Sequence, residues 1–258
     1  MHLKNQAVLV TGGGRAIGRC VALRLAREGT YLCVVDRKEA ALEETAAEIR
    51  GLGVRAESAV AYLRHEDQVR EAVCLASERL GSIDILVNNA GIIGPTDPIE
   101  EVRREDWNEV LEVNLTGAFL FSKAVVPHMI RQRRGWIINI SSIAGKIAYP
   151  LRIPYAVSKW GLIGLTLTLA SEMGPYNITA NALCPGPVKG ARMQEVIRRR
   201  ARESDRSIEE VTNEYVSRTS LGRMVTKEEV AATVAFLAGK SGAGITGQAI
   251  NVAAGYGL

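Results

Sequence analysis

The sequence of 258 residues is poor in cysteine, histidine and aromatic residues, and it lacks a long uninterrupted apolar run. The four cysteines, Cys20, Cys33, Cys74 and Cys184, stand singly in apolar segments, without the spacing of a disulfide framework or a zinc site. We therefore expect buried free thiols in a reducing compartment and no bound metal.

No segment approaches the roughly 20 apolar residues of a membrane span, and the N-terminal MHLKNQAVLVTGG enters a strand pattern without the apolar core of a signal peptide. The formal net charge of +4 is mild and gives no concentrated basic face for nucleic acid. We expect a cytoplasmic protein that binds neither membrane nor nucleic acid. Its length suits one α/β domain over residues 1–258.

Glycine, in contrast, is plentiful, and it clusters after the first apolar strand pattern, residues 7–10. There the chain reads Thr11-Gly12-Gly13-Gly14-Arg15-Ala16-Ile17-Gly18, followed by a helical apolar pattern. Such a turn lets backbone N–H groups and the positive end of a helix approach a pyrophosphate. A plain glycine-rich turn is the alternative, because the spacing differs from the generic Gly-x-Gly-x-x-Gly fingerprint.

A second strand pattern, residues 31–35, ends in Asp36, at close to the ~20-residue spacing from the glycine turn expected of an acid that accepts hydrogen bonds from an adenosine ribose. A carboxylate there repels a 2′-phosphate and favours NAD over NADP. Arg15 and Arg37 oppose this preference, because either could pair with a 2′-phosphate. An N-cap of the next helix is a further interpretation of Asp36. We predict NAD, with NADP less favoured.

Strand and helix patterns alternate along the chain, which is typical of right-handed βαβ units and a parallel sheet. We expect further strands at 54–60, 83–87, 136–140, 178–183 and 248–252, and helices at 39–49, 66–80, 105–131, 155–173 and 227–237. Asn114 and Gly117 are poor helix formers inside the third of these helices, so a kink is predicted there. A kink frees a backbone carbonyl to hold water; a hydrogen-bonded structural asparagine is the alternative.

The segment 141–159 carries three polar groups that converge after an apolar strand. Ser142 follows that strand, where α/β sheets bind ligands. Tyr155 and Lys159, at i and i+4 on a helix expected to begin near Pro154, share one face. An ammonium beside a phenol favours the phenolate, which would make Tyr155 a usable acid/base. Taken alone, however, such a pair is usually solvent-exposed, so the other motifs decide its interpretation.

The residues resemble the short-chain dehydrogenase/reductase family over nearly the whole chain. The motifs that carry the resemblance follow the family's order and spacing: Thr11-Gly12-x-x-x-Ala16-x-Gly18, Asn88-Asn89-Ala90-Gly91, Asn114, Ser142, Tyr155-x-x-x-Lys159 and Pro185-Gly186. The resemblance implies a Rossmann-like, doubly wound parallel sheet of about seven strands in the order 3-2-1-4-5-6-7, with helices on both faces. It also implies a homotetramer formed through the two long helices and the C-terminal strand.

By position, the resemblance implies that Tyr155 is the general acid/base, that Ser142 holds the substrate oxygen and that Lys159 binds the nicotinamide ribose. Asn114 would hold the water that continues the proton relay. The residues expected at the cofactor are Gly12, Arg15, Ile17, Gly18, Asp36, Arg37, Leu63, Asn89, Ala90, Gly91, Tyr155, Lys159, Pro185, Gly186 and Val188. The expected reaction interconverts a secondary alcohol and a ketone with NAD. The alternatives are an NADPH-dependent 3-oxoacyl-thioester reductase and a non-catalytic nucleotide-binding sensor.

The sequence departs from the family pattern at several positions. Ala16 replaces a glycine of the cofactor loop and is strained if it needs a positive φ. Tyr62 stands where an aspartate often contacts adenine, and Gly190 replaces a threonine that reaches the nicotinamide amide. The usual Val-Asp-Gly-Gly near the C-terminus is Val252-Ala253-Ala254-Gly255 here.

The substrate end depends on two segments. Arg152, three residues before Tyr155, is a candidate for recognising an anion, although an exposed position is equally compatible with the sequence. Ile93, Tyr149, Ile153 and Met193 are the candidates for an apolar wall. The charged excursion 188–221 carries an amphipathic pattern that predicts a helix acting as a lid. Its arginines, between 192 and 206, are expected mainly on a solvated face, with anion binding as the alternative.

Overall fold

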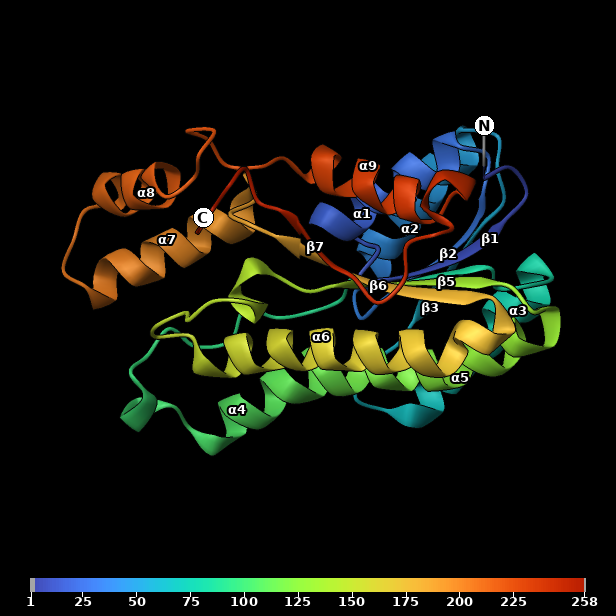
Figure 1. Ribbon diagram of the computed structural model, residues 1–258, viewed down its shortest axis with the longest axis horizontal. Helices are drawn as coiled ribbons and strands as arrows, with labels where there is room; N and C mark the ends of the chain where they lie inside the picture. Colours follow the sequence, from blue (N-terminus) through green and yellow to red (C-terminus); the bar gives the residue numbers. More distant parts are fainter. Residues whose placement is uncertain (1–2, 258) are drawn as a thin grey trace.

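The computed structural model describes residues 3–257, in which seven strands form one parallel sheet in the order β3-β2-β1-β4-β5-β6-β7 (Figure 1). The strands are β1 (Ala7–Thr11), β2 (Tyr31–Asp36), β3 (Ala56–Val60), β4 (Ile85–Asn88), β5 (Gly135–Ile140), β6 (Ile178–Pro185) and β7 (Ala249–Val252). The predicted fold class and strand order are confirmed. Residues 1, 2 and 258 of the predicted domain lie outside the described residues.

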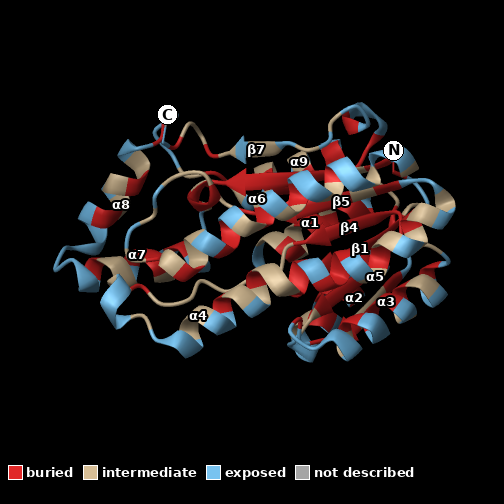
Figure 2. Cartoon of the chain, turned by 60° about the horizontal axis from the view of Figure 1, so that its bottom comes forward, coloured by how far each residue is buried: buried red, intermediate tan, exposed pale blue. Residues whose placement is uncertain are grey.

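Helices cover both faces of the sheet (Figure 1). One face packs against α1 (Ala16–Arg27), α2 (Glu39–Gly51) and α9 (Lys227–Leu237), and the other against α3 (Glu66–Leu80), α5 (Gly117–Gln132) and α6 (Ile153–Met173). The central strands are therefore buried on both sides, as Figure 2 shows, and this explains their continuous apolar sequences. β7, at the edge, is only partly buried.

The helix predicted at 105–131 is confirmed together with its interruption. It consists of α4 (Arg104–Leu111) and α5, joined by a π-helical turn at Glu112–Thr116 that contains Asn114. By length and composition the continuous stretch Arg104–Gln132 resembles a membrane span, but 44% of its apolar window is buried within the fold. We interpret it as a core helix, and the π-helical turn points Asn114 inward.

The charged excursion forms α7 (Ala191–Glu203) and α8 (Ile208–Ser217), which extend beyond the carboxyl end of the sheet (Figure 1). The amphipathic pattern of α7 is confirmed, because Met193, Val196 and Ile197 are buried in a small apolar cluster with Tyr215 and Tyr256. This cluster is separate from the two cores that flank the sheet. The excursion therefore packs over the sheet edge at which the polar motifs lie.

Short turns complete the connections, as single 3₁₀ turns at Ile99–Glu101, Ile143–Gly145, Gly174–Tyr176 and Lys240–Gly242. The second of these turns follows β5 and begins at Ser142, whose side chain accepts a hydrogen bond from the backbone N–H of Ala144. This local cap holds the Ser142 hydroxyl at the carboxyl end of the sheet.

Candidate active site

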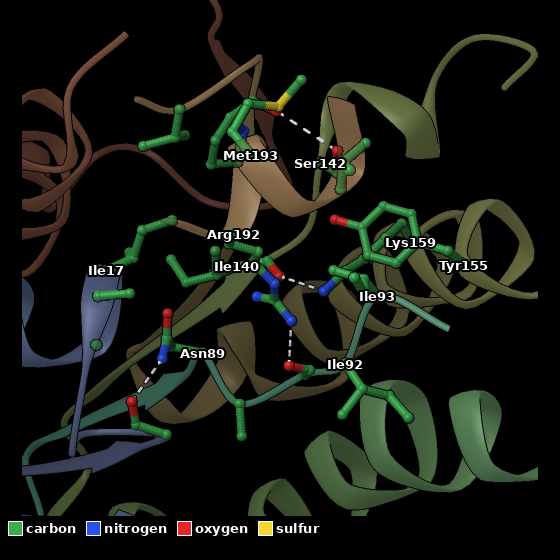
Figure 3. A pocket seen from close by; sticks show the side chains of 18 of the residues that line it. Ile17, Asn89, Ile92, Ile93, Ile140, Ser142, Tyr155, Lys159, Arg192 and Met193 are labelled. Carbon is green, nitrogen blue, oxygen red and sulfur yellow. Dashed lines mark hydrogen bonds between the residues drawn. The ribbon is translucent and has the colours of Figure 1, made fainter. Parts of the chain in front are cut away.

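A cavity of about 710 Å³ opens at the carboxyl end of the sheet, between the glycine loop, the ends of β4, β5 and β6, and α7. Its size is within the range of sites that hold a cofactor together with a small substrate. Of the residues predicted at the site, all except Asn114 and Ile153 line this cavity. Figure 3 shows side chains from the opposite walls pointing toward one another.

The glycine loop is packed too tightly to accept side chains at its key positions. Gly12 has a φ of +65°, and a Cβ on Gly18 would lie 2.0 Å from the Gly12 carbonyl oxygen. Asn89 holds the loop by donating to the carbonyls of Thr11, at 2.9 Å, and Gly12, at 3.1 Å. The loop backbone therefore forms one wall of the cavity.

The N-terminus of α1, which follows this loop, is free to bind an anion. Its N-cap residue, Arg15, makes no side-chain capping bond, and its first turn contains no acidic residue. The orphan N–H groups and the positive helix dipole are therefore available to a pyrophosphate. The cradle fits the dinucleotide that the sequence predicted.

The replacement of a family glycine by Ala16 strains the backbone as expected, since Ala16 adopts a φ of +48°. This is the left-handed region, in which a Cβ is unfavourable by roughly 1–2 kcal/mol. The strain lies at the first residue of α1, directly against the predicted pyrophosphate site.

Asp36 lines the cavity at its glycine-loop end, beside Gly14, and its contact with an adenosine ribose stays a prediction. Its Oδ1 accepts hydrogen bonds from the backbone N–H groups of Arg37, at 2.8 Å, and Lys38, at 3.4 Å. The N-cap residue of α2 is Lys38, so the alternative interpretation of Asp36 as the N-cap is wrong. Arg15 and Arg37 line the same end, as does Arg64, which the sequence analysis did not single out.

The asparagines after β4 tie strand ends together, as predicted. Asn88 Nδ2 donates to Asn139 Oδ1 on β5, at 2.9 Å, and Asn139 Nδ2 in turn donates to Thr166 Oγ1 on α6, at 2.8 Å. All three side chains are buried. This network couples β4, β5 and α6, and it fixes α6 relative to the sheet.

Asn114 lies behind the cavity wall rather than on it, and its side chain is fully hydrogen-bonded. Its Oδ1 accepts from the backbone N–H of Ile92, at 2.7 Å, while its Nδ2 donates to the Ile92 carbonyl, at 3.1 Å, and to Ser158 Oγ, at 3.0 Å. Ser158 Oγ donates to the Tyr155 carbonyl, at 2.7 Å. The Asn114 side chain therefore clamps the loop after β4 to the first turns of α6, and the water expected at the interrupted helix stays a prediction.

Ser142, Tyr155 and Lys159 share the cavity, and Figure 3 shows the Tyr155 hydroxyl pointing into it. The Ser142 hydroxyl lies 3.5 Å from the Pro185 carbonyl, and Lys159 Nζ donates to the Ile140 carbonyl at 2.9 Å. Lys159 Nζ is 5.7 Å from the centre of the Tyr155 ring. Such an arrangement can hold a substrate oxygen between a serine hydroxyl and a tyrosine hydroxyl.

Lys159 is almost completely buried, with 4% of its surface exposed. Burial lowers the pKa of its ammonium from 10.5 to about 7, and the positive charge of Arg192 acts in the same direction. The lysine therefore exchanges its proton close to neutral pH. It is a hydrogen-bond donor in either protonation state.

Four of the residues predicted to contact the substrate line the cavity, namely Ile93, Tyr149, Arg152 and Met193, and their contact with a substrate stays a prediction. Arg152 is 3% exposed, so its alternative placement on the surface is wrong. Tyr149 is held by a 3.0 Å hydrogen bond between its hydroxyl and that of Tyr215 on α8. Ile153 was also predicted here, but the structure places it in a separate shallow pocket with Ile99 and Trp107. As the first residue of α6, it faces the side away from the cavity.

Among the lining residues that sequence reasoning missed are Arg192, Tyr215 and Tyr256. Arg192 was named only as part of a charged cluster, yet its guanidinium donates to the Gly91 carbonyl in the middle of the cavity (Figure 3). Its position at the start of an amphipathic helix just after Pro185-Gly186 is the sequence signal that could have identified it. Tyr215 and Tyr256 come from α8 and the C-terminal segment, and no local pattern distinguishes them.

The remaining arginines of the excursion are mostly paired rather than simply solvated. Arg199 pairs with Glu195, while Arg200 and Arg206 both pair with Glu214. The Arg200–Glu214 pair joins α7 to α8, whereas the Arg199–Glu195 pair lies within α7. The expected solvated face holds for Arg198, Arg202 and Arg206, which are exposed, whereas Arg199 and Arg200 are partly buried.

A Rossmann-like sheet, an uncapped helix N-terminus beside a glycine loop, and a serine, tyrosine and lysine in one cavity define the class of nucleotide-dependent α/β oxidoreductases. The family model described as short chain dehydrogenase matches residues 6–202. The chain belongs to the short-chain dehydrogenase family and is an oxidoreductase.

Known relatives span the whole chain. The 3-oxoacyl-[acyl-carrier-protein] reductase of Thermotoga maritima is 36% identical over 255 residues, covering 99% of both chains. The structure of NAD⁺-bound xylitol dehydrogenase matches with a TM-score of 0.97 at 34% identity, covering 99% of this chain and 100% of that one. A variant of actinorhodin polyketide ketoreductase, with NADPH, matches with a TM-score of 0.93 at 37% identity, covering 98% and 97% of the two chains.

Proposed function

We propose that this protein interconverts a secondary alcohol and a ketone by hydride transfer, with Tyr155 exchanging the hydroxyl proton. The observation that carries the proposal is the convergence of Ser142, Tyr155 and Lys159 on one cavity that also contains the glycine loop. A bound nicotinamide cofactor would supply or accept the hydride. The protein would supply orientation and proton transfer.

Each polar residue has a distinct role in the proposed mechanism. Ser142, whose hydroxyl is positioned by the Ala144 N–H, would donate a hydrogen bond to the substrate oxygen. Tyr155 would give a proton to that oxygen in reduction and remove it in oxidation. Lys159, tethered to the Ile140 carbonyl, would hold the nicotinamide ribose. Asn114, in the π-helical turn, would hold the water that continues the proton relay, and its side chain would position the Ile92 loop and the first turns of α6.

Replacement of Tyr155 tests this mechanism. We expect Tyr155→Phe to lower kcat about 10³-fold, because positioned acid/base groups contribute roughly 10²–10⁴, while NADH binding followed by fluorescence stays within about threefold. Tyr31→Phe is the matched control, since its hydroxyl bonds only to Asn5 Oδ1 in residues 3–257 and does not line the cavity. Retained turnover in Tyr155→Phe would refute the mechanism.

We propose NAD as the preferred cofactor, because Asp36 lines the cavity beside the glycine loop with its carboxylate fixed by two backbone N–H groups, where it would repel a 2′-phosphate. The match to NAD⁺-bound xylitol dehydrogenase supports this choice. The wild type should show a higher kcat/KM with NAD than with NADP, and Asp36→Asn should reduce that ratio at least tenfold. A wild-type preference for NADP would overturn the role of Asp36.

The second candidate is an NADPH-dependent 3-oxoacyl-thioester reductase. Two observations favour it: the name of the Thermotoga maritima relative, and the arginines Arg15, Arg37 and Arg64 beside Asp36. Acetoacetyl-thioester reduction with NADPH and with NADH separates the two functions. A thioester kcat/KM that exceeds that of every simple alcohol or ketone, with NADPH preferred, would establish this alternative.

We also propose assembly through α5 and α6, whose outer surfaces expose the large apolar side chains of Phe119, Trp160 and Leu167 at 46%, 52% and 49%. Apolar side chains that gather on neighbouring helices indicate a protein interface. Light scattering after size exclusion should give a tetramer, and Trp160→Glu should lower the assembly state. A monomeric wild type would contradict this proposal.

A further inference from the structure

Arg152 is a buried cation without a carboxylate partner. Only 3% of its surface is exposed, and none of the ion pairs among residues 3–257 involves it. Its Nη2 donates to the Ile93 carbonyl at 2.5 Å, whereas its buried Nε has no hydrogen-bond partner. The buried Asp84, by comparison, pairs with Arg134 at 2.5 Å.

Such a state is unfavourable unless something compensates the charge, because removing an ion from water costs several kcal/mol. The rings of Tyr155 and Tyr149 compensate in part, since the guanidinium carbon lies 5.1 Å and 5.9 Å from their centres. Neither tyrosine accepts a hydrogen bond from the Nε–H of Arg152, which remains unpaired. The cavity into which Arg152 faces is therefore a place where an oxyanion would be stabilised.

A second guanidinium reaches the same space. Arg192 extends from α7 to the Gly91 carbonyl, in the middle of the cavity (Figure 3). Arg192 keeps an exposed surface, while desolvation of its guanidinium within the cavity lowers its pKa, and the charges of Arg15 and Arg152 act in the same direction. The two arginines thus donate to carbonyls of the same segment, those of Ile93 and Gly91, and their like charges repel each other.

The carboxylates that line the cavity do not neutralise this pair of arginines. Asp36 lies at the glycine-loop end, Glu195 pairs with Arg199, and Glu109 is an exposed residue of α4. An arginine edge with a free N–H matches the fork geometry of a carboxylate. Because the guanidinium carbon of Arg152 lies 5.1 Å from the centre of the Tyr155 ring, a carboxylate bound there would lie close to the carbon on which the tyrosine acts.

We propose that the substrate is a small hydroxy acid, or the corresponding oxo acid, whose carboxylate is bound by Arg152 with help from Arg192. This inference rests on the proposed alcohol–ketone chemistry and adds its substrate class. It places the hydroxyl group at carbon 2 or carbon 3 of the acid. It also distinguishes this site from one built for a neutral polyol, which would leave the buried guanidinium without a counter-charge.

The test compares each acid with its neutral primary amide. We would measure kcat/KM for a panel of 2- and 3-hydroxy acids, their amides and uncharged polyols, with NAD and NADP, in the wild type and in Arg152→Gln. The glutamine keeps an N–H donor for the Ile93 carbonyl but loses the charge. Arg199→Gln is the matched control, because Arg199 donates to the neighbouring Gly94 carbonyl at 3.2 Å but already pairs with Glu195 and does not line the cavity.

The wild type should prefer acids to amides, and Arg152→Gln should lower kcat/KM for acids about 100-fold through KM while changing that for amides less than threefold. Arg199→Gln should leave the acid-to-amide ratio unchanged. Equal loss for acids and amides in Arg152→Gln would reduce Arg152 to a structural role and overturn the proposal. A wild type that prefers polyols or amides would overturn it as well.

A binding measurement separates this inference from the proposed function. Malonate, which has carboxylates but no hydroxyl to oxidise, should raise the Tm of the NADH-bound wild type and leave that of Arg152→Gln unchanged. If malonate binds in this way but no substrate is turned over, the proposed oxidoreductase function fails while the anion site stands. If malonate has no effect on the wild type, the anion site is refuted even if alcohols are oxidised.

Discussion

Removal of the Asn114 side chain should separate its clamping role from the chemistry of the site. Asn114→Ala deletes hydrogen bonds of 2.7, 3.1 and 3.0 Å to Ile92 and Ser158, in a side chain that is 1% exposed. At about 1 kcal/mol for each bond, we expect the free energy of unfolding to fall by about 3 kcal/mol. For a protein of this size, that corresponds to a Tm about 6–12 °C lower.

Ser158→Ala is the matched comparison, because it removes only the branch of the network that reaches α6. Its loss of the Asn114 contact and of the bond to the Tyr155 carbonyl should lower stability by about 1 kcal/mol. The Ile92 loop remains clamped in this variant. Differential scanning calorimetry and NADH titration measure both effects, and NADH affinity should fall more in Asn114→Ala because Gly91 and Ile92 line the cavity. Equal Tm values for the two variants would refute the assignment of the main clamp to Ile92.

Three further changes test other features. Ala16→Gly should raise the free energy of unfolding by about 0.5 kcal/mol, because relief of the left-handed conformation slightly outweighs the entropy of glycine; a lower Tm would contradict the strain at φ +48°. Thr226→Ala removes the capping box of α9, whose partner is Glu229, and should lower stability by about 1 kcal/mol in urea unfolding; an unchanged midpoint would mean that the cap is dispensable. Lys159→Met should have a higher free energy of unfolding than the wild type, because the pKa of the lysine is about 7 in the folded protein and 10.5 in the unfolded chain. The gain should be largest at pH 7 and should decrease toward pH 10.5. A gain in urea unfolding that does not vary with pH would argue against a buried lysine with a lowered pKa.

Much of this architecture follows from local pattern. Parallel strands buried on both faces require continuous apolar runs, so β1, β2 and β5 could be located from composition. The glycine loop, Asp36 and the Tyr155–Lys159 pair were recognisable because their spacing reflects backbone geometry within one or two elements. The break at Asn114 was detectable for the same reason, since asparagine and glycine are unfavourable in an apolar helix.

The environment of each charged side chain depended on segments distant in the chain. Arg152 and Ile153 are neighbours in sequence, yet the first turn of α6 directs Arg152 into the cavity and Ile153 into another pocket. Helical rotation by about 100° per residue separates such neighbours, and only the packing of α6 against the sheet decides which side faces the site. From the sequence alone, both Arg152 and Ile153 were therefore predicted at the substrate.

The sequence alone determined the order of strands and helices, the glycine loop and the set of polar groups at the carboxyl end of the sheet, because these are properties of short-range periodicity and spacing. Tertiary structure alone decided that Arg152 is buried without a carboxylate, that Arg192 reaches Gly91, and that Tyr215 supports Tyr149. These contacts join residues far apart in the chain. Whether a charge is paired depends on such contacts, and no local pattern records them.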